Sequence, residues 1–341
     1  MKNSTNKTGS VLILALWTIS LLTIFAVQIG LSARQRVKLL SRLEDRSQLR
    51  LIAEAGAKKA IAALRTDLER NDQNYSSYGK YYRHNNPDMF YRVALGEGYT
   101  IVSYQYLEEA SAPPKVYYGF IDEESKLNMN TASRDELKRL MDHVVTTDSD
   151  EAQGLVEAII SWREKGETQL TGFYSDDYYA SLQYPYEAKH FFFESLDELS
   201  LVKGLTPNVL KKLSPLITIY GDGRVNINTA SKEVLRALGL EDVLVDKILM
   251  VRQGLDGLEH TVDDHIFYKT FDVASEITNF IELSVGEVKQ IDDLNTLGKI
   301  KTNSSVFLIQ AQGYLEGTAE ELGVVCVYNS LENYIEYWRE K

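Results

Sequence analysis

The feature that constrains this chain most is an uncharged apolar run at residues 10–31. No Asp, Glu, Lys or Arg lies between Lys7 and Arg34. A helix needs about 20 mostly apolar residues to cross the hydrocarbon layer of a membrane, and this run is long enough. Lipid offers no hydrogen-bond partner to backbone N–H and C=O groups, so a spanning helix satisfies them within itself. The sequence therefore predicts one transmembrane helix over residues 10–31.

The polar residues 1–9 in front of this run allow three interpretations. A secretory signal has a basic start, an apolar core of about 7 to 15 residues and a small-residue cleavage site. Residues 31–33 offer a weak site of that kind, but the apolar core is too long. A plain anchor is the second interpretation, and its orientation should follow the basic flanks. Lys2 and Lys7 lie before the run, and further basic residues follow it from Arg34 onward, so the flanks do not decide the orientation of the helix.

In the third interpretation, residues 1–9 resemble the leader of a type IV prepilin. Such a leader is short and basic, ends in glycine and is removed by a prepilin peptidase, while the apolar helix is retained. The resemblance implies cleavage between Gly9 and Ser10. Pilins usually carry glutamate at the fifth position of the mature chain, which here is Leu14. Loss of that glutamate is similar to the K-type minor subunit of type II secretion, and it would mark the position of the subunit in a filament.

Beyond the apolar run, the helical pattern continues. Apolar residues recur mostly three, four or seven apart from Val37 to Leu68, with charged residues between them. We expect one helix over about residues 10–68, on the order of 90 Å long, with its second half laid against a soluble head. Gly56 lies between two alanines. This pattern predicts that the helix packs closely on a sheet at that point.

Extended segments lie at both ends of the remaining chain. Residues 98–107 and 116–121 predict two neighbouring antiparallel strands, and residues 305–315, 321–328 and 334–339 predict three more. Residues 321–328 contain the only cysteine, Cys326, which we expect to be buried in its strand. The predicted fold class is α+β, with a long N-terminal helix packed on an antiparallel sheet. A helical segment interrupts that sheet.

An internal repeat lies within this helical segment. Residues 128–133 and 226–231 both have the pattern Asn-x-Asn-Thr-Ala-Ser, 98 residues apart. Ser133 and Ser231 are placed to cap a following helix, because an acidic residue and then leucines at helical spacing come after each. Each unit is thus predicted to be a strand-like entry into a short helix. We expect residues 127–280 to form an all-helical module of small hairpins.

The chain from Phe120 to Leu240 resembles the type II secretion minor pseudopilin K family more closely than generic pilins. The resemblance rests on residues 121–123 and 127–130, 177–179, 185–186, 193–199, 201–206, 213–218 and 225–238. It implies a pilin-like domain carrying a large helical insertion, and a place at the tip of a pseudopilus with I-type and J-type minor pseudopilins. A minor subunit of a related type IV pilus-like machine is an alternative.

The resemblance also implies a division of the chain and a location. Residues 1–9 would be the prepilin leader, and residues 10–31 the transmembrane part of the helix. Residues 32–126 would hold the rest of the helix and the first strands, residues 127–280 the insertion, and residues 281–341 the remaining sheet. The protein would be anchored once in the bacterial inner membrane with its body in the periplasm. It would support protein export, with the prepilin peptidase and other pseudopilins as partners.

One departure from the family concerns calcium. The family commonly follows the tryptophan that ends a helix with several aspartates, but here Trp162 is followed by Arg163 and Glu164. Calcium takes about six to eight oxygen ligands, usually with several carboxylates. Asp176 and Asp177 remain as candidate ligands. The site is incomplete at the level of sequence, so we expect no cofactor to be required.

Nucleic-acid binding is the main rival function. The repeated motif also resembles the opening of helix-hairpin-helix DNA-binding proteins, which would make this a membrane-anchored DNA-binding protein. However, the formal net charge is −12 and the pI is about 5.1. Binding to a phosphate backbone draws on clustered Lys and Arg. The turn after the second repeat has Glu241 and Asp242 where an anion would lie, so we expect no nucleic-acid partner.

The sequence contains no pattern typical of an enzyme. The five histidines form no His-Glu-x-x-His motif, and no serine lies in a Gly-x-Ser-x-Gly segment. We expect His260 and His265 to be a surface loop pair, and Asp263 with Asp264 to lie in a solvated turn. The sequence therefore predicts a noncatalytic assembly subunit.

Overall fold

A computed structural model describes residues 8–70, 84–106, 115–164, 176–261 and 263–341. The helices are α1 (Thr8–Arg70), α3 (Pro87–Phe90), η1 (Glu123–Ser125), α4 (Arg134–Val144), α5 (Ser149–Arg163), α6 (Asp176–Ala180), η2 (Leu196–Leu201), α7 (Pro207–Leu213), α8 (Lys232–Ala237), α9 (Asp242–Arg252), η3 (Thr270–Asp272), α10 (Val273–Thr278) and α11 (Val285–Thr296). The strands are β1 (Val93–Leu95), β2 (Gly98–Val102), β3 (Tyr104–Tyr106), β4 (Lys115–Tyr117), β5 (Ile121–Asp122), β6 (Leu127–Asn128), β7 (Ile217–Thr218), β8 (Val225–Asn226), β9 (Ile300–Lys301), β10 (Val306–Leu315), β11 (Glu321–Asn329) and β12 (Tyr334–Glu340).

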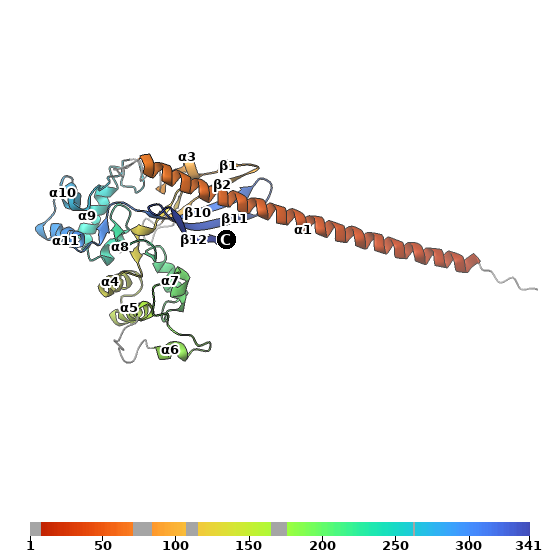
Figure 1. Cartoon of the computed structure of the whole chain (residues 1–341), viewed down its shortest axis with the longest axis horizontal. Helices are drawn as coiled ribbons and strands as arrows, with labels where there is room; N and C mark the ends of the chain where they lie inside the picture. The colour runs from red at the N-terminus through yellow and green to blue at the C-terminus, as the bar shows by residue number, and fades with distance from the viewer. Residues whose placement is uncertain (1–7, 71–83, 107–114, 165–175, 262) are drawn as a thin grey trace, which may run out of the picture.

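The fold is α+β, as predicted, and its parts lie in a clear order. Helix α1 runs as one continuous rod, and only its second half touches the head (Figure 1). The main antiparallel sheet has the order β1-β2-β10-β11-β12, with β5 also paired to β10. Helices α4 to α11 form a separate lobe beside this sheet (Figure 1). The predicted long helix and the three late strands are confirmed.

The predicted antiparallel pairing of the early strands is confirmed for β3 and β4 but not for β2. β3 and β4 are antiparallel neighbours, with Tyr104 opposite Tyr117. β2, in contrast, pairs with β1 on one side and with β10 on the other, where Thr100 lies opposite Gly313. β2 and β10 are about 200 residues apart in the chain, so no local pattern could indicate that they pair.

The sheet and α1 share one hydrophobic core. Buried residues of the second half of α1 pack on the inward side chains of β2, β10 and β11: Leu49, Ile52, Ala53, Ala57, Ala60, Leu64, Val102, Phe307, Ile309, Ala311, Val324 and Cys326. Burial raises the pKa of the Cys326 thiol to about 12, which keeps it protonated and inert at neutral pH. The sequence prediction of a buried strand cysteine is confirmed.

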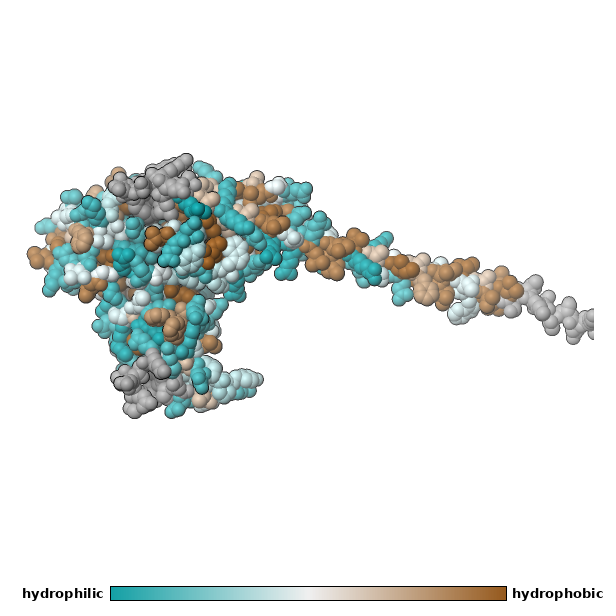
Figure 2. Space-filling view, in the orientation of Figure 1, coloured by the Kyte–Doolittle hydropathy of each residue, from teal (hydrophilic) through white to brown (hydrophobic). Residues whose placement is uncertain are grey.

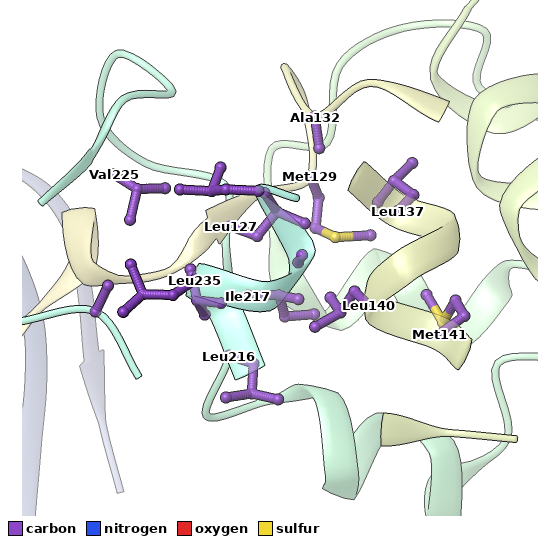
Figure 3. Close-up of a cluster of buried hydrophobic side chains, with 14 of the residues drawn as sticks. Leu127, Met129, Ala132, Leu137, Leu140, Met141, Leu216, Ile217, Val225 and Leu235 are labelled. Atoms are coloured by element: carbon purple, nitrogen blue, oxygen red, sulfur yellow. The ribbon is translucent and has the colours of Figure 1, made fainter. Parts of the chain in front are cut away.

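The helical lobe has its own core, which joins the two repeats. Leu137 and Leu140 of α4, Met129, Ile217 of β7 and Leu235 of α8 point into one cluster (Figure 3). α4 and α8 are the repeat-equivalent helices, and Arg139 on α4 donates a hydrogen bond to the carbonyl of Ala237 at 2.9 Å. The repeat therefore forms a pair of units that cover one another's apolar faces.

The predicted end of the helical insertion at residue 280 is too early. α11 begins at Val285, and its Ile291 and Leu294 are buried in the core of the helical lobe rather than against the main sheet. Ile300 of β9 belongs to the same core and pairs in parallel with Val225 of β8. The lobe therefore extends through β9, and the chain returns to the main sheet only at β10. The other predicted boundaries are not tested by this comparison.

Gly56 lies where α1 passes closest to β2, as predicted. A Cβ atom built on Gly56 would overlap the Thr100 side chain, whose hydroxyl donates to the carbonyl of Gln312 at 2.9 Å. An alanine would favour the helix by about 1 kcal/mol on intrinsic propensity. Overpacking of a well-packed core typically costs about 1 to 3 kcal/mol. The steric cost of the added methyl group therefore outweighs the gain in helix propensity, and alanine should destabilise the fold.

We expect Gly56→Ala to lower the free energy of unfolding of the head by about 1 to 2 kcal/mol. The measurement is urea unfolding of the full chain in detergent. Gly30→Ala is the matched control, because no atom lies within 4 Å of a Cβ at Gly30. An unchanged or raised stability of Gly56→Ala would contradict the close packing described for this position.

Candidate functional site

The first half of α1 exposes a continuous apolar surface that water would not favour. Its apolar side chains, from Val11 to Leu31, are exposed in the isolated chain. Figure 2 shows this apolar surface extending along the helix away from the head. Within the described residues, this is the one helix long and apolar enough to cross a membrane. It is therefore a candidate membrane anchor.

The predicted processing and position residues lie at the start of this helix. α1 begins at Thr8, so Gly9 and Ser10 are in its first turn, and their side chains lie outside what the structure describes. Leu14 is 68% exposed and one turn further along. Nothing in the fold opposes the predicted roles of these three residues, and nothing in it tests them.

The predicted calcium ligands are not brought together with other acids in the described part of the chain. Asp177 is exposed on α6, while the side chain of Asp176 and residues 165–175 before it lie outside the described residues. Among the described residues, no group of three or more His, Cys, Asp or Glu could hold a metal ion. The calcium site stays a prediction of the family resemblance.

The prediction that His260 and His265 form a surface pair is wrong. His260 is 4% exposed, and its ring stacks on that of His84 with centroids 5.0 Å apart. The rings of Tyr106 and Tyr117 on the β3–β4 hairpin also contact it edge-on. This hairpin folds over the loop after α9, which local sequence could not indicate. His265 instead contacts Glu276, with Nε2 and Oε2 at 2.9 Å.

Of the two neighbouring acids, Asp264 is buried and Asp263 is exposed. Asp264 is buried and accepts a hydrogen bond from the backbone N–H of His260 at 2.9 Å, so the prediction of a solvated turn is wrong for it. Asp263 is exposed and accepts from the N–H groups of Leu255 and Asp256. Both carboxylates organise the loop between α9 and residue 265.

The second asparagine of each repeat binds the backbone of a distant segment. Asn130 receives the N–H of Phe193 on its side-chain oxygen at 2.7 Å and donates to the carbonyl of the same residue at 3.0 Å. Asn228, its equivalent, makes the same pair of bonds with Phe267, at 2.9 and 2.8 Å. The amide therefore imitates one rung of a β-ladder, and this explains why the repeat requires asparagine at the second position.

Each repeat is locked by an arginine from the end of its second helix. Arg163 donates to the carbonyl of Met129 at 2.7 Å, and Arg252 donates to the equivalent Ile227 at 3.1 Å. Arg252 is 1% exposed and forms an ion pair with Glu259 at 2.6 Å. Both repeats were predicted, but these arginine contacts were not; their sequence signal is an arginine shortly before a glycine after each repeat, at Arg163 and Arg252.

Three consecutive acids join the sheet to the helical lobe. Asp122, at the end of β5, accepts from Thr229 at 2.5 Å and from Asn226 at 3.1 Å in the second repeat, and from Ser304 at 2.7 Å just before β10. Burial raises the pKa of Asp122, against the hydrogen bonds that favour its charged form. One side chain thus ties both connections between the two lobes.

The next two acids extend this junction, and each has a buried lysine partner. Glu123 pairs with Lys126 at 2.6 Å and accepts from Thr218 of β7. Glu124 pairs with Lys301 of β9 at 2.6 Å. At the level of sequence, residues 121–123 served only as a family marker. Apart from Lys126, the partners of Asp122, Glu123 and Glu124 are about 95 to 180 positions away, and only the fold brings them together.

Lys203 and Lys212, near the turn that would have to bind phosphate in a helix-hairpin-helix protein, make contacts within the lobe. The Lys203 ammonium lies over the ring of Tyr178 at 4.3 Å, and Lys212 donates to the carbonyl of Val145 at 3.2 Å. At the second hairpin, Asp242 pairs with Arg236 at 2.6 Å, so the place for a phosphate carries a carboxylate. The geometry therefore favours a structural role for these turns.

A capping interaction in the lobe predicts a specific pH dependence. Hydrogen bonding from Lys247 and from the backbone of Ser284 lowers the pKa of Glu287 to about 2. Because the folded-state pKa is depressed, the stabilisation is present above the ordinary glutamate range and is lost as pH falls towards 2. We expect Glu287→Gln to be less stable at pH 7, and the difference from wild type to shrink between about pH 5 and 2.

Urea unfolding of the full chain at a series of pH values measures this difference. Asp292→Asn, an exposed acid on the same helix, is the control and should stay parallel to wild type. A difference between Glu287→Gln and wild type that is constant with pH would contradict the assignment.

Comparison with known proteins agrees with this geometry. Residues 120–222 match the family model described as type II secretion system (T2SS), protein K. A chain in the crystal structure of the GspK-GspI-GspJ complex from the enterotoxigenic Escherichia coli type 2 secretion system has a similar fold, with a TM-score of 0.65 and 14% identity. That match covers 89% of this chain and 99% of the other. The comparison with curated proteins finds no match. The match confirms the predicted resemblance to type II secretion protein K for residues 120–222, and the solved structure shows that the two chains share a fold.

Proposed function

We propose that this chain, which carries the family domain of type II secretion protein K, is a noncatalytic minor pseudopilin at the tip of a type II secretion pseudopilus. In this role it helps to initiate and cap the filament and so supports protein export across the outer membrane. The observation that carries the proposal is the architecture itself. A single exposed apolar helix continues without a break into the core of a bulky α+β head.

The same architecture supports the proposed location and partners. An apolar half-helix exposed on all sides fits a lipid environment before assembly and a bundle of similar helices afterwards. We place the anchor in the bacterial inner membrane and the head in the periplasm. The partners are I-type and J-type minor pseudopilins, other pseudopilins and the prepilin peptidase. The likeness to a chain of a GspK-GspI-GspJ complex supports the first two.

The absence of an acid at Leu14 supports a position at the tip. In pilins, the glutamate at this position is thought to pair with the N-terminal amine of the preceding subunit. A carboxylate without that partner would cost about 2.5 to 3.5 kcal/mol or more in the membrane interior. A subunit with no neighbour above it has no amine to bind. Leu14 therefore removes an interaction that only internal subunits can use.

We expect Leu14→Glu to reduce the amount of this chain recovered at filament tips, because the new carboxylate lacks an amine partner there. Cross-linking of the chain to I-type and J-type subunits in assembled pseudopili measures its incorporation. Leu14→Ala is the control, since it changes the same position without adding a carboxylate, and it should assemble like wild type. Tip assembly that is unchanged by Leu14→Glu would contradict this role for Leu14.

A further inference from the structure

Basic side chains follow one another along α1 at a strict spacing of four residues. They are Arg34, Lys38, Arg42, Arg46 and Arg50. Four residues turn an α-helix by about 400°, so neighbouring members of this cationic row are displaced by about 40°, and the four from Arg34 to Arg46 span about 120° of the helix surface. The first four cover about 18 Å of helix length. They are exposed, and they begin directly after the predicted membrane span.

The cationic row lies on the side of the helix that carries the head. Leu49 and Ala53 are buried under the sheet, and they lie seven residues after Arg42 and Arg46. Seven residues make almost two full turns, so these pairs share one side within about 20°. Arg36 is six residues before Arg42 and so lies about 120° around the helix from it. The row therefore occupies the space beneath the head, where α1 extends beyond it (Figure 1).

The last member of the row shows the contact that such a side chain makes. Arg50 pairs with Glu340 at the end of β12 at 2.9 Å and with Glu54 at 3.1 Å. Among the described residues, no ion pair is formed by the four lower members. Glu44 and Asp45 are neighbours of the row in sequence, but among the described residues neither forms an ion pair with it, so these four cations stay available to a partner.

We infer that Arg34, Lys38, Arg42 and Arg46 bind an acidic face on the head of a neighbouring subunit, seated beneath this chain's own head. The inference rests on the proposed function and specifies the chemistry of one subunit contact. An acidic head is the natural complement. In this chain itself, residues 1–50 hold eight of the 37 Lys and Arg and two of the 49 acids, so residues 51–341 carry a net charge of −18.

The arrangement favours a protein partner over anionic lipid. A membrane surrounds a spanning helix on every side, so binding to headgroups requires no particular register, whereas this row is one-sided. Arg46 is 15 residues beyond Leu31, about 22 Å along the axis. Headgroups extend only about 5 to 8 Å beyond the hydrocarbon layer on each side. The upper half of the row therefore lies beyond the phosphates.

The test uses the full chain in detergent with the I-type and J-type subunits of the same secretion system. We compare R42Q/R46Q with R36Q/K59Q, which removes the same charge from the same helix, at Arg36 on another side and at Lys59 about 20 Å beyond Arg46 along the axis. R42Q/R46Q should weaken complex formation roughly tenfold at low salt, R42E/R46E should weaken it further, and R36Q/K59Q should bind like wild type. High salt should reduce the difference between the row variant and the control.

The possible outcomes distinguish a failure of the proposed function from a failure of the inference about the cationic row. If wild type binds neither subunit, the proposed function fails and the inference fails with it. If wild type binds and R42Q/R46Q binds equally well, or weakens no more than R36Q/K59Q, only the inference is overturned. Reconstitution in nanodiscs of phosphatidylcholine, with or without phosphatidylglycerol, completes the test. A defect that appears only with phosphatidylglycerol would assign the row to lipid and overturn the inference.

Discussion

Gly9→Ala should leave the chain entirely as an uncleaved precursor in the presence of a prepilin peptidase. The physical reason is access to the bond before Ser10, because the resemblance to prepilins implies that the enzyme admits no side chain at the residue before the cut. An uncut chain would keep Lys2 and Lys7 in front of the apolar run. A polar, charged leader cannot enter the hydrocarbon layer, so the start of α1 could not pack among neighbouring helices.

Mass spectrometry and N-terminal sequencing of membrane-extracted protein measure this result. Wild type should begin at Ser10, and Gly9→Ala should begin at Met1. Gly30→Ala, on the same helix, should be processed like wild type. A wild-type chain that begins at Met1 would indicate a plain anchor, and one that begins at Arg34 a secreted protein. Normal processing of Gly9→Ala would disprove the leader assignment.

Arg252→Met should cause the largest loss of stability among substitutions in the head. The guanidinium of Arg252 is buried, pairs with buried Glu259 and donates to the carbonyls of Ile227 and Ala230. Removing one member of a buried ion pair typically costs about 3 to 5 kcal/mol, because the remaining charge stays desolvated. A native domain has only about 5 to 15 kcal/mol in total. We therefore expect partial unfolding of the helical lobe.

The first repeat supplies the matched control for this prediction. Arg163 holds the equivalent carbonyl of Met129, but its acidic partner Glu164 is half exposed and remains solvated when the arginine is lost. Arg163→Met should therefore cost about 1 to 3 kcal/mol. Thermal unfolding of both variants, followed by circular dichroism, gives the comparison. Equal losses would contradict the assignment of the larger effect to the buried Arg252 and Glu259 pair.

Much of the candidate site could be predicted because its signals are local. The apolar run needs no partner within the chain to be recognised, since its length alone matches a membrane. The serine caps could be predicted for the same reason. Ser133 and Ser231 accept the N–H of Glu136 and Val234, each three residues ahead, so one window of sequence holds both partners. The cationic row on α1 also has a local signal, a spacing of four residues, although at the level of sequence its first members counted only as a basic flank of the apolar run.

The sequence by itself determined the anchor, the repeat, the caps and the fold class, because each depends on periodicity or spacing within about one or two turns of chain. The tertiary structure decided the rest. The union of Asp122 with Asn226 and Ser304, the pairing of β2 with β10 and the burial of His260 all join residues far apart in sequence. Such contacts follow from how the lobes close on one another, which no local pattern records. The side on which the cationic row lies belongs to the same class, because only the packing of Leu49 and Ala53 on the sheet defines it.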